Sequence, residues 1–551
     1  MVNLPSKDEP RFKLRLLICL CSTMVHFTLS ANRVALTISF EAMLSPEPDE
    51  TISTSPVNSS QRIEKTTISK LSSSDHHKKD DPKSLKQLNV NKTVDLNQTK
   101  TNPYKVELTE STKDRFFEII FFGGLISPIP TGRLADKYGP KLVVTILLLI
   151  NAVVMSLFPM VASWSIYCAA ALMFLKGAGT SPLFSCSSVL CAHWCPKYEK
   201  TMYVSTVATG SMMAIIAANP LSGFLCSLDF LGGWPLCFYL MGSINILVVC
   251  IWLLIVTNDP AEHPLISPAE KELVLNERTP IDEFNTKSPP YLKMLTCGPF
   301  WALIVAHFAS SWFSTLISHQ VPDYFKTVLH VSMTEDGIYS GLPYVGSAIC
   351  LSIFSFIIDK LRANGKLSTT AIRKISADIG FIFAPAFMIL STFFGKNLIA
   401  VLACVCAAKA MAAAQFAGIY SVHLDIAPSY VGSLAGIIET VQNGASMAMN
   451  HATLSLIGDQ PTLHHWSNLF LATAVVCIIG THYFALLGSS KLQPWDPTFK
   501  SEEKAIEDDQ NGDMSYPTIF DPEIYVVDAR SGSIIRKHSI SAASFDIVHP
   551  N

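Results

Sequence analysis

The sequence predicts an all-α membrane protein with twelve transmembrane helices in two pseudo-symmetric six-helix bundles. Of its 551 residues, 49% are hydrophobic and only 15% are charged, and the mean hydropathy is positive, which is typical of a chain surrounded by lipid. Apolar runs of about 20 residues, the length that crosses a hydrocarbon core of about 30 Å, recur in two groups of six. The lysines and arginines lie in loops between these runs and form no concentrated basic surface, which excludes a nucleic-acid-binding protein.

The two groups of apolar runs divide the chain into an N-terminal bundle (14–257) and a C-terminal bundle (299–488). The expected spans lie near residues 14–43, 116–135, 142–162, 165–192, 203–227 and 235–257, then 299–320, 337–358, 376–394, 398–424, 431–457 and 467–488. The first run is also compatible with a signal peptide, but it lacks a small-residue cleavage site and stays apolar past Arg33, which favours a retained span. The remaining segments, which show no pattern of a folded domain, are an N-terminus (1–13), a polar linker (258–298) and a charged, flexible tail (489–551).

Cations gather in the loops on one side of the predicted membrane. They precede the first span, follow the second and separate the eighth from the ninth, at Arg11, Lys13, Arg15, Lys137, Lys141, Lys360, Arg362, Lys366, Arg373 and Lys374. Because positive loops stay in the cytosol, both termini, the linker and the tail are expected there. The plasma membrane and an endolysosomal or secretory vesicle membrane both fit this topology.

Residues 45–113 form a long polar loop that the same argument places outside the cytosol. The loop is rich in Ser, Thr, Lys and Asp, which predicts disorder. It holds three Asn-x-Ser/Thr sequons, at Asn58, Asn91 and Asn97, which predict a glycoprotein. In the tail, Tyr516–Ile519 matches the short Tyr-based pattern that adaptor proteins read, a pattern that is also common by chance.

The cysteines and histidines do not form the spacing of a metal site. Most of the fourteen cysteines lie inside apolar runs as small buried residues. Cys226 and Cys237 flank a short loop, and they could form a disulfide if that loop faces an oxidising lumen. His193, His307 and His451 are isolated in apolar sequence, where a core role is commoner than metal binding. We find no nucleophile with an aligned base, so no catalytic residue and no enzyme activity are expected.

The sequence GRLADKYGPK, from Gly132 to Lys141, resembles the signature loop between the second and third spans of the major facilitator superfamily. Gly132 allows close helix approach, Asp136 can accept hydrogen bonds at a helix N-terminus, and Lys137 and Lys141 hold the loop in the cytosol. In that family the loop is a latch between the two halves, so the candidate latch residues are Gly132, Asp136, Lys137, Gly139 and Lys141.

A weaker copy of the signature, IDKLRANGK (358–366), occupies the matching place in the second half and adds Asp359 to the latch residues. Such internal duplication is typical of transporters whose binding site lies between two repeats. Ser355 replaces the counterpart of Gly132, which predicts a degenerate second latch.

Four motifs in the second half resemble the anion transporters related to sialin, the vesicular glutamate and nucleotide transporters and the type I sodium/phosphate cotransporters. They are PDYF (322–325), GIYSGLPY (337–344), LSTTAIRKI (367–375) and HLDIAPSY (423–430). The resemblance covers nearly all of residues 11–490. It implies secondary active transport of a small organic or inorganic anion (carboxylate, phosphate or urate class) by a single chain, driven by H⁺, Na⁺ or the membrane potential, with no bound cofactor.

Three cations inside apolar runs are the candidate substrate-binding residues. Arg33 matches an arginine that similar transporters use near the substrate path, and a guanidinium can bind a carboxylate or phosphate through two hydrogen bonds. Lys176 and Lys409 lie about eleven residues into their spans, near mid-membrane. The alternatives are that Arg33 snorkels to the interface and that Glu41, Glu118 or Glu439 neutralises the two lysines in helix-packing ion pairs.

The chain departs from its relatives at the position of their proton-coupling acid, which is Thr180 here. An arginine of the seventh span of vesicular glutamate transporters falls at Ser310, which argues against glutamate as substrate. Glu41, Glu439, His423 and Asp425 are the remaining candidates for coupling or charge pairing, with a gating or structural role favoured for the last two. The alternative function is an anion receptor that does not transport.

Overall fold

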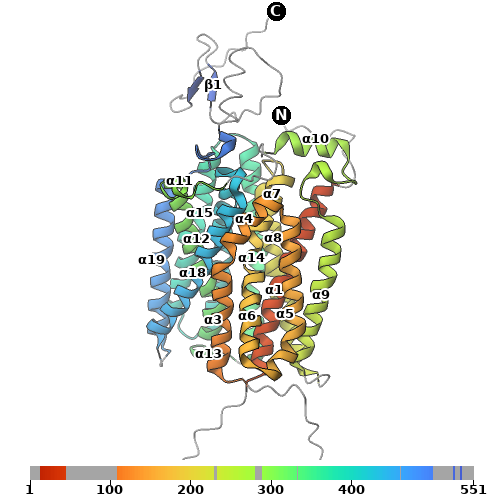
Figure 1. Ribbon diagram of the computed structural model, residues 1–551. Coiled ribbons are helices and arrows are strands. Elements are labelled where there is room, and N and C mark those ends of the chain that lie inside the picture. Colours follow the sequence, from red (N-terminus) through yellow and green to blue (C-terminus); the bar gives the residue numbers. More distant parts are fainter. Residues whose placement is uncertain are drawn as a thin grey trace, which may run out of the picture.

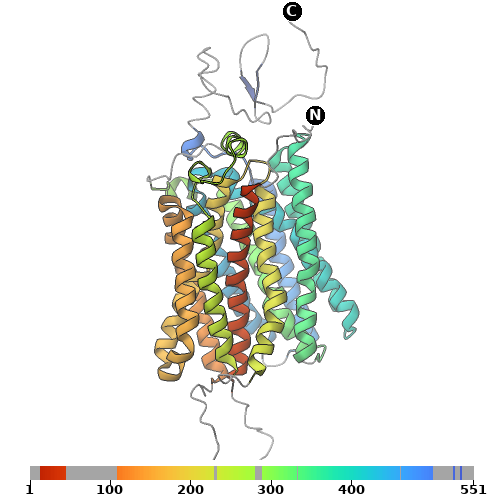
Figure 2. The same ribbon diagram turned by 90° about the vertical axis from the view of Figure 1, so that its right-hand side faces the viewer.

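The computed structural model describes residues 13–44, 108–228, 233–278, 288–331, 333–458, 461–499, 525–527 and 534–536. Long helices run side by side and form a bundle with two ends (Figure 1, Figure 2). We call the end at which α1 (Leu14–Ala42) begins the N side, and the end at which α1 stops and α3 (Glu110–Ile126) begins the loop side. The sequons Asn58, Asn91 and Asn97 and the pattern Tyr516–Ile519 lie outside the described residues.

Two proline breaks shape the first half. Its other helices are α4 (Pro128–Tyr138), α5 (Pro140–Trp164), α6 (Ile166–Thr180), α7 (Leu183–Trp194), α8 (Lys200–Ser227) and α9 (Trp234–Ile255). Pro128 begins α4, and Pro182 separates α6 from α7. Because proline lacks an N–H and clashes with the preceding turn, it breaks the helix. The helix that follows then begins with backbone N–H groups that lack partners within it.

The second half has the same general plan with a distorted seventh span. Its helices are α12 (Gly298–Thr315), the π-helix η4 (Leu316–Gln320), α13 (Val321–Thr327), α14 (Met333–Ala363), α15 (Thr369–Phe393), α16 (Leu398–Ile419), α17 (Val422–Ile426), the 3₁₀ turn η5 (Pro428–Tyr430), α18 (Val431–Ile457) and α19 (Leu463–Leu487). Beyond them, β1 (Tyr525–Val527) pairs antiparallel with β2 (Ile534–Arg536).

Nine helical segments of the described chain are long and apolar enough to cross a membrane. On the outside of the bundle, large apolar side chains are exposed, with Leu254 85% and Ile399 81% accessible, as expected for a surface that faces lipid. Three further segments pack among these nine but are broken or more polar: the pairs α3–α4 and α6–α7 in the first half, and α18 in the second. The expectation of twelve spans therefore rests, for these three, on their place in the bundle.

Each half has its own hydrophobic core. Two clusters of buried apolar side chains lie within the first half, and one large cluster around Phe313, Tyr324 and Phe381 lies within the second. Two smaller clusters contain residues of both halves. This division is what two rigid bundles that move against each other require.

The connecting segment between the halves is docked on the first half by its N-terminal part. It contains η3 (Pro260–Glu262), α10 (Pro268–Glu277) and α11 (Tyr291–Leu295). The Glu270 carboxylate accepts hydrogen bonds from the backbone N–H groups of Leu14 and Arg15, at 2.9 and 3.0 Å, and so caps α1. Burial raises the pKa of Asp259, but hydrogen bonds from His193, the Ala261 N–H and Arg278 outweigh it and hold that pKa well below its usual value.

The tail is ordered in its first part, where the sequence predicted flexibility from residue 489. Asp496 accepts hydrogen bonds from the Ser429 N–H at 3.1 Å and from the Ser429 hydroxyl at 2.7 Å, beside the start of α18. The Gln493 N–H donates to the Ile426 carbonyl. These contacts give residues 490–499 a fixed place on the N side, which the polar composition of the tail did not predict.

Candidate functional site

Arg33 is an accessible cation deep in the bundle. It lies nine residues before the end of α1, about 14 Å from the loop side at ~1.5 Å per residue. Its side chain is exposed although the neighbouring residues Asn32 and Ala35 are fully buried. Among the described residues, its guanidinium has no hydrogen-bond or ion-pair partner. An arginine at this depth without a carboxylate is costly unless it meets water or an anion.

Lys176 lies beside Arg33 and is held by amide and hydroxyl groups. Its Nζ donates to the Asn151 Oδ1 of α5 at 2.6 Å, and the Thr180 hydroxyl donates to the same oxygen at 3.0 Å. Lys176 is buried, and its charge interacts unfavourably with that of Arg33. Within the part of the chain that the structure describes, these two like charges have no acidic partner. They form a site of positive potential, which an anion would relieve.

His319 of the second half completes this site, and the sequence analysis missed it. It lies in η4, its side chain is exposed, and its ring is close enough to Arg33 for their charges to interact. A π-helical turn inside a long helix is frequent at functional sites. Nothing in the local sequence LISHQ announces such a turn, although a histidine in an apolar run was a signal that could have been noticed.

Lys409 does not join this cluster in the described structure. It is buried in α16, and its Nζ lies over the Tyr344 ring of α14, 5.0 Å from the centroid. The aromatic face therefore stabilises its charge. Of the three cations that the sequence predicts as substrate-binding residues, the structure brings only Arg33 and Lys176 together.

The three glutamates considered as partners of the lysines are placed elsewhere. Glu41 forms an exposed ion pair with Lys113, with Nζ and Oε1 3.1 Å apart. Glu118 is exposed on α3. Glu439 is buried, and its carboxylate accepts hydrogen bonds from backbone N–H groups of α7. In the described residues, no carboxylate forms an ion pair with Arg33, Lys176 or Lys409, so the helix-packing alternative lacks its contacts.

The predicted latch residues join α4 to the start of α18. The Asp136 carboxylate accepts hydrogen bonds from the N–H groups of Gly432 and Ser433, at 2.7 and 2.8 Å, and from the Ser433 hydroxyl at 2.5 Å. A carboxylate at a helix N-terminus satisfies free N–H groups and also interacts favourably with the helix dipole. Asp136 thereby bonds the first half to the second.

Glycine is required where α4 and α18 cross. A Cβ on Gly132 would lie 2.1 Å from the Gly432 carbonyl oxygen, which no side chain tolerates. The other signature residues shape the turn after α4. Gly139 has φ +85° and packs against Asn258, whose Oδ1 accepts a hydrogen bond from the Lys141 N–H. Lys137 is exposed, and its Nζ lies over the Tyr138 ring.

We expect Gly132→Val to abolish uptake, because the two halves can no longer approach on the N side. The measurement is the initial rate of anion uptake into vesicles at equal surface expression. Gly223→Val is the matched control, since a Cβ at Gly223 meets nothing within 4 Å. Normal uptake by Gly132→Val would show that this contact is not needed for turnover.

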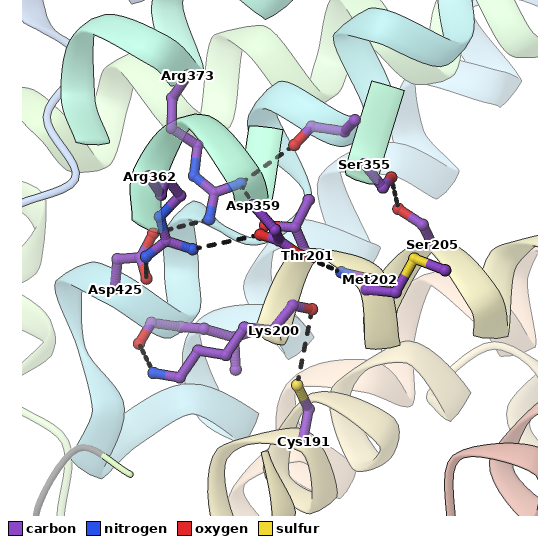
Figure 3. A network of polar contacts seen from close by, with 12 residues as sticks. Cys191, Lys200, Thr201, Met202, Ser205, Ser355, Asp359, Arg362, Arg373 and Asp425 are labelled. Carbon is purple, nitrogen blue, oxygen red and sulfur yellow. Dashed lines mark hydrogen bonds and ion pairs between the residues drawn. The ribbon is translucent and has the colours of Figure 1, made fainter. Parts of the chain in front are cut away.

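The second latch is intact, contrary to the expectation from Ser355. The Asp359 carboxylate accepts the Met202 N–H at 2.9 Å in the first turn of α8, so it binds the first half as Asp136 binds the second (Figure 3). Ser355 forms a hydrogen bond with Ser205 across the same interface. The serine replaces the close glycine contact with a polar one, which the sequence comparison could not anticipate.

Buried charges surround the second latch (Figure 3). Asp425 lies 3.0 Å from the Arg373 guanidinium and 3.6 Å from that of Arg362, and both arginines are buried. Arg373 also donates to the Thr201 hydroxyl of α8, and the Lys200 Nζ donates to the Leu424 carbonyl. Asp425 thus compensates cations on both sides of the interface.

Two further contacts between the halves lie on the N side and near the middle of the bundle. The His423 Nε2 lies 2.8 Å from the Ser188 hydroxyl of α7. The Asn443 amide donates to the Gly124 carbonyl and to the Ser181 hydroxyl, at 2.9 and 2.6 Å. Gly124 is 14 residues from the loop-side end of α3, or about 21 Å. Arg33, by contrast, lies on the loop side of these contacts.

Comparison with known proteins identifies this arrangement. The sequence model of the Major Facilitator Superfamily matches residues 117–449. The chain belongs to the major facilitator superfamily. It is 31% identical to human sialin over 377 residues, which cover 68% of this chain and 75% of sialin. It is 25% identical to mouse sodium-dependent phosphate transport protein 3 over 482 residues, which cover 88% of this chain and 95% of that one.

Solved structures of transporters show the same fold. A bacterial homologue of the iron transporter ferroportin in an outward-facing state aligns with a TM-score of 0.56 at 12% identity, covering 85% of this chain and 98% of that one. The E. coli fucose:proton symporter aligns with a TM-score of 0.51 at 13% identity, covering 85% and 99%. The major facilitator fold thus accounts for the two bundles, their separate cores and the site between them. In the described residues, no group of three or more His, Cys, Asp or Glu side chains could hold a metal ion.

Proposed function

We propose that this protein is a secondary active transporter that moves a small anion across a membrane by alternating access. The observation that carries the proposal is the Arg33–Lys176 site, which has an accessible guanidinium, a buried ammonium and no described carboxylate to neutralise them. It lies between two separately packed halves of a major facilitator fold. The relatives named above, sialin and a sodium-dependent phosphate transport protein, support an anionic substrate.

The N side is assigned to the cytosol and the loop side to the lumen or the exterior. This assignment rests on the cations that precede the first span and follow the second. Both latches lie on the N side, whereas Arg33 and His319 are exposed nearer the loop side. The conformation described here is therefore closed toward the cytosol, with its anion site accessible from the opposite side.

The substrate belongs to the carboxylate, phosphate or urate class, because a guanidinium beside an ammonium binds planar or tetrahedral oxyanions through several charge-assisted hydrogen bonds. One chain contains both halves of the site, so a monomer suffices. The driving force is an ion gradient, with H⁺ or Na⁺ as the coupling ion, or the membrane potential.

The test is flux into proteoliposomes that contain the purified protein. Labelled phosphate, urate, sialate, glutamate and a nucleotide are offered while the pH, sodium and potential gradients are imposed one at a time. We expect one anion class to accumulate under one gradient and to compete with its analogues, and neutral analogues to have no effect. If no anion moves while one of them still raises the melting temperature, the protein is an anion receptor and the transport proposal is wrong.

A further inference from the structure

Glu439 is a buried carboxylate that reaches from the second half into the first. It lies in α18, eight residues from the N side, or about 12 Å. Its Oε1 accepts the Phe184 N–H at 2.8 Å and its Oε2 accepts the Ser185 N–H at 3.3 Å. These donors belong to the first turn of α7, which begins after the break at Pro182 and therefore has free N–H groups. The side chain is 4% accessible.

The compensation of the Glu439 charge comes from the other half of the protein. Titratable groups on the surrounding elements include Cys186 of α7, whose thiol interacts with Glu439 and with Asp136 of α4. His307 of α12 contacts Gln442, one turn from Glu439, and the His423 ring of α17 packs against the Phe184 ring. From α3, the backbone carbonyls of Leu125 and Gly124 accept hydrogen bonds from Thr440 and Asn443 of α18. Within the described chain, no lysine or arginine interacts with the Glu439 carboxylate. The two N–H groups, the Ser185 hydroxyl and the dipole of α7 are thus its means of stabilisation.

A polar connection links Glu439 with the anion site. Asn443 donates to the Glu439 carbonyl at 2.9 Å and to the Ser181 hydroxyl at 2.6 Å. Ser181 directly follows Thr180, whose hydroxyl shares the Asn151 oxygen with Lys176. A change at the anion site can therefore reach the contact between α18 and α7 through a few hydrogen bonds.

Opening of the N side must separate α18 from α7, since these helices belong to different halves. An ionised Glu439 would then lose both N–H donors while still surrounded by apolar side chains, and a buried carboxylate without partners costs several kcal/mol. Protonation lowers this cost, because a neutral carboxyl group is much less costly to bury than a carboxylate.

We propose that Glu439 is the proton-coupling residue of this transporter. In the state accessible from the loop side, the carboxylate binds one proton, weakens its bonds to the Phe184 and Ser185 N–H groups and permits the halves to part on the N side. The proton leaves to the cytosol, and the regenerated carboxylate caps α7 again when the N side closes. This inference rests on the proposed transport function and specifies H⁺ as the coupling ion.

The test compares wild-type protein with Glu439→Gln in proteoliposomes. A glutamine can still accept an N–H bond but cannot titrate, so we expect loss of the uptake driven by a pH gradient and loss of the accompanying proton flux, measured with a trapped pH dye. Exchange of labelled for unlabelled anion without a gradient should continue. Glu439→Asp should keep part of the gradient response, and Glu118→Gln, at an exposed position of α3, should keep all of it.

Two outcomes would overturn the proposal. One is a Glu439→Gln protein whose uptake still responds to the pH gradient and still carries protons. The other is loss of exchange together with gradient-driven uptake, which would make Glu439 a closing contact only.

A second measurement is independent of transport. The infrared difference spectrum between neutral and acidic pH should contain a protonated-carboxyl band that Glu439→Gln lacks. If wild-type protein moves no anion, the transport proposal fails, and this spectrum still decides whether Glu439 takes up a proton.

Discussion

Arg33→Ala is expected to abolish concentrative anion uptake at ordinary substrate concentrations. A charge-assisted hydrogen bond contributes about 1.5–3 kcal/mol, and the guanidinium can form two of them with one oxyanion. Loss of even part of this energy raises KM by about 10- to 100-fold, at about 1.4 kcal/mol per factor of ten. Lys176 cannot replace it, because its ammonium is buried and lacks the planar pair of donors that a guanidinium offers. The measurement is the concentration dependence of the initial uptake rate.

Two variants serve as controls for this result. Arg33→Lys retains the charge but not the planar pair of donors, so we expect an intermediate KM. Arg115→Ala removes an exposed arginine near the loop-side end of α3 and should leave KM unchanged. If Arg33→Ala transports with a normal KM, the side chain only reaches toward the membrane surface, and the anion site must be sought around Lys409.

Asp425→Ala is expected to lower the free energy of unfolding by about 3–5 kcal/mol, the usual result when one partner of a buried ion pair is removed. The substitution leaves Arg373 and Arg362 buried, at 0% and 2% accessibility, with Asp359 as their nearest remaining carboxylate. Asp425→Asn should be milder, since an amide oxygen still accepts a hydrogen bond. Melting of the purified protein in detergent gives the comparison.

Glu262→Ala is the control for stability, because Glu262 is an exposed acid of the connecting segment and its loss should be almost neutral. A melting temperature of Asp425→Ala equal to that of wild-type protein would mean that water already reaches the two arginines. The cluster of Figure 3 would then contribute little to folding.

The sequence predicted the features of the fold that follow from hydrophobic patterning and local motifs. The apolar lengths predicted the spans, because membrane thickness restricts which residues fit. The resemblance of Gly132–Lys141 to the superfamily signature predicted the first latch. The role of Asp359 was also readable from the repeat. The number of contacts at the second latch was underestimated. A glycine lets two helices approach closely, but a serine at the same place can hold them together by a hydrogen bond.

The site itself was only partly predictable. Depth along a helix placed Lys176 and Lys409 near mid-membrane, but it could not give rotation about the helix axis, which directs Lys409 to Tyr344. His319 depends on a π-helical turn that no local pattern marks. The partners of Glu439 are backbone N–H groups that the helix break at Pro182 leaves without intrahelical acceptors. Every residue type except proline has such a group, so the sequence does not point to these two.

The two aspartates of the latches have a further consequence for the energetics of the cycle. Asp136 of the first half caps α18 of the second, and Asp359 of the second half caps α8 of the first. Because each half moves as one body, tilting it strains both caps at the same time. The contacts that close the N side should therefore break in a single cooperative step, not one after another. Such all-or-none release keeps partly opened, leaky states rare and protects the gradient on which uphill transport depends.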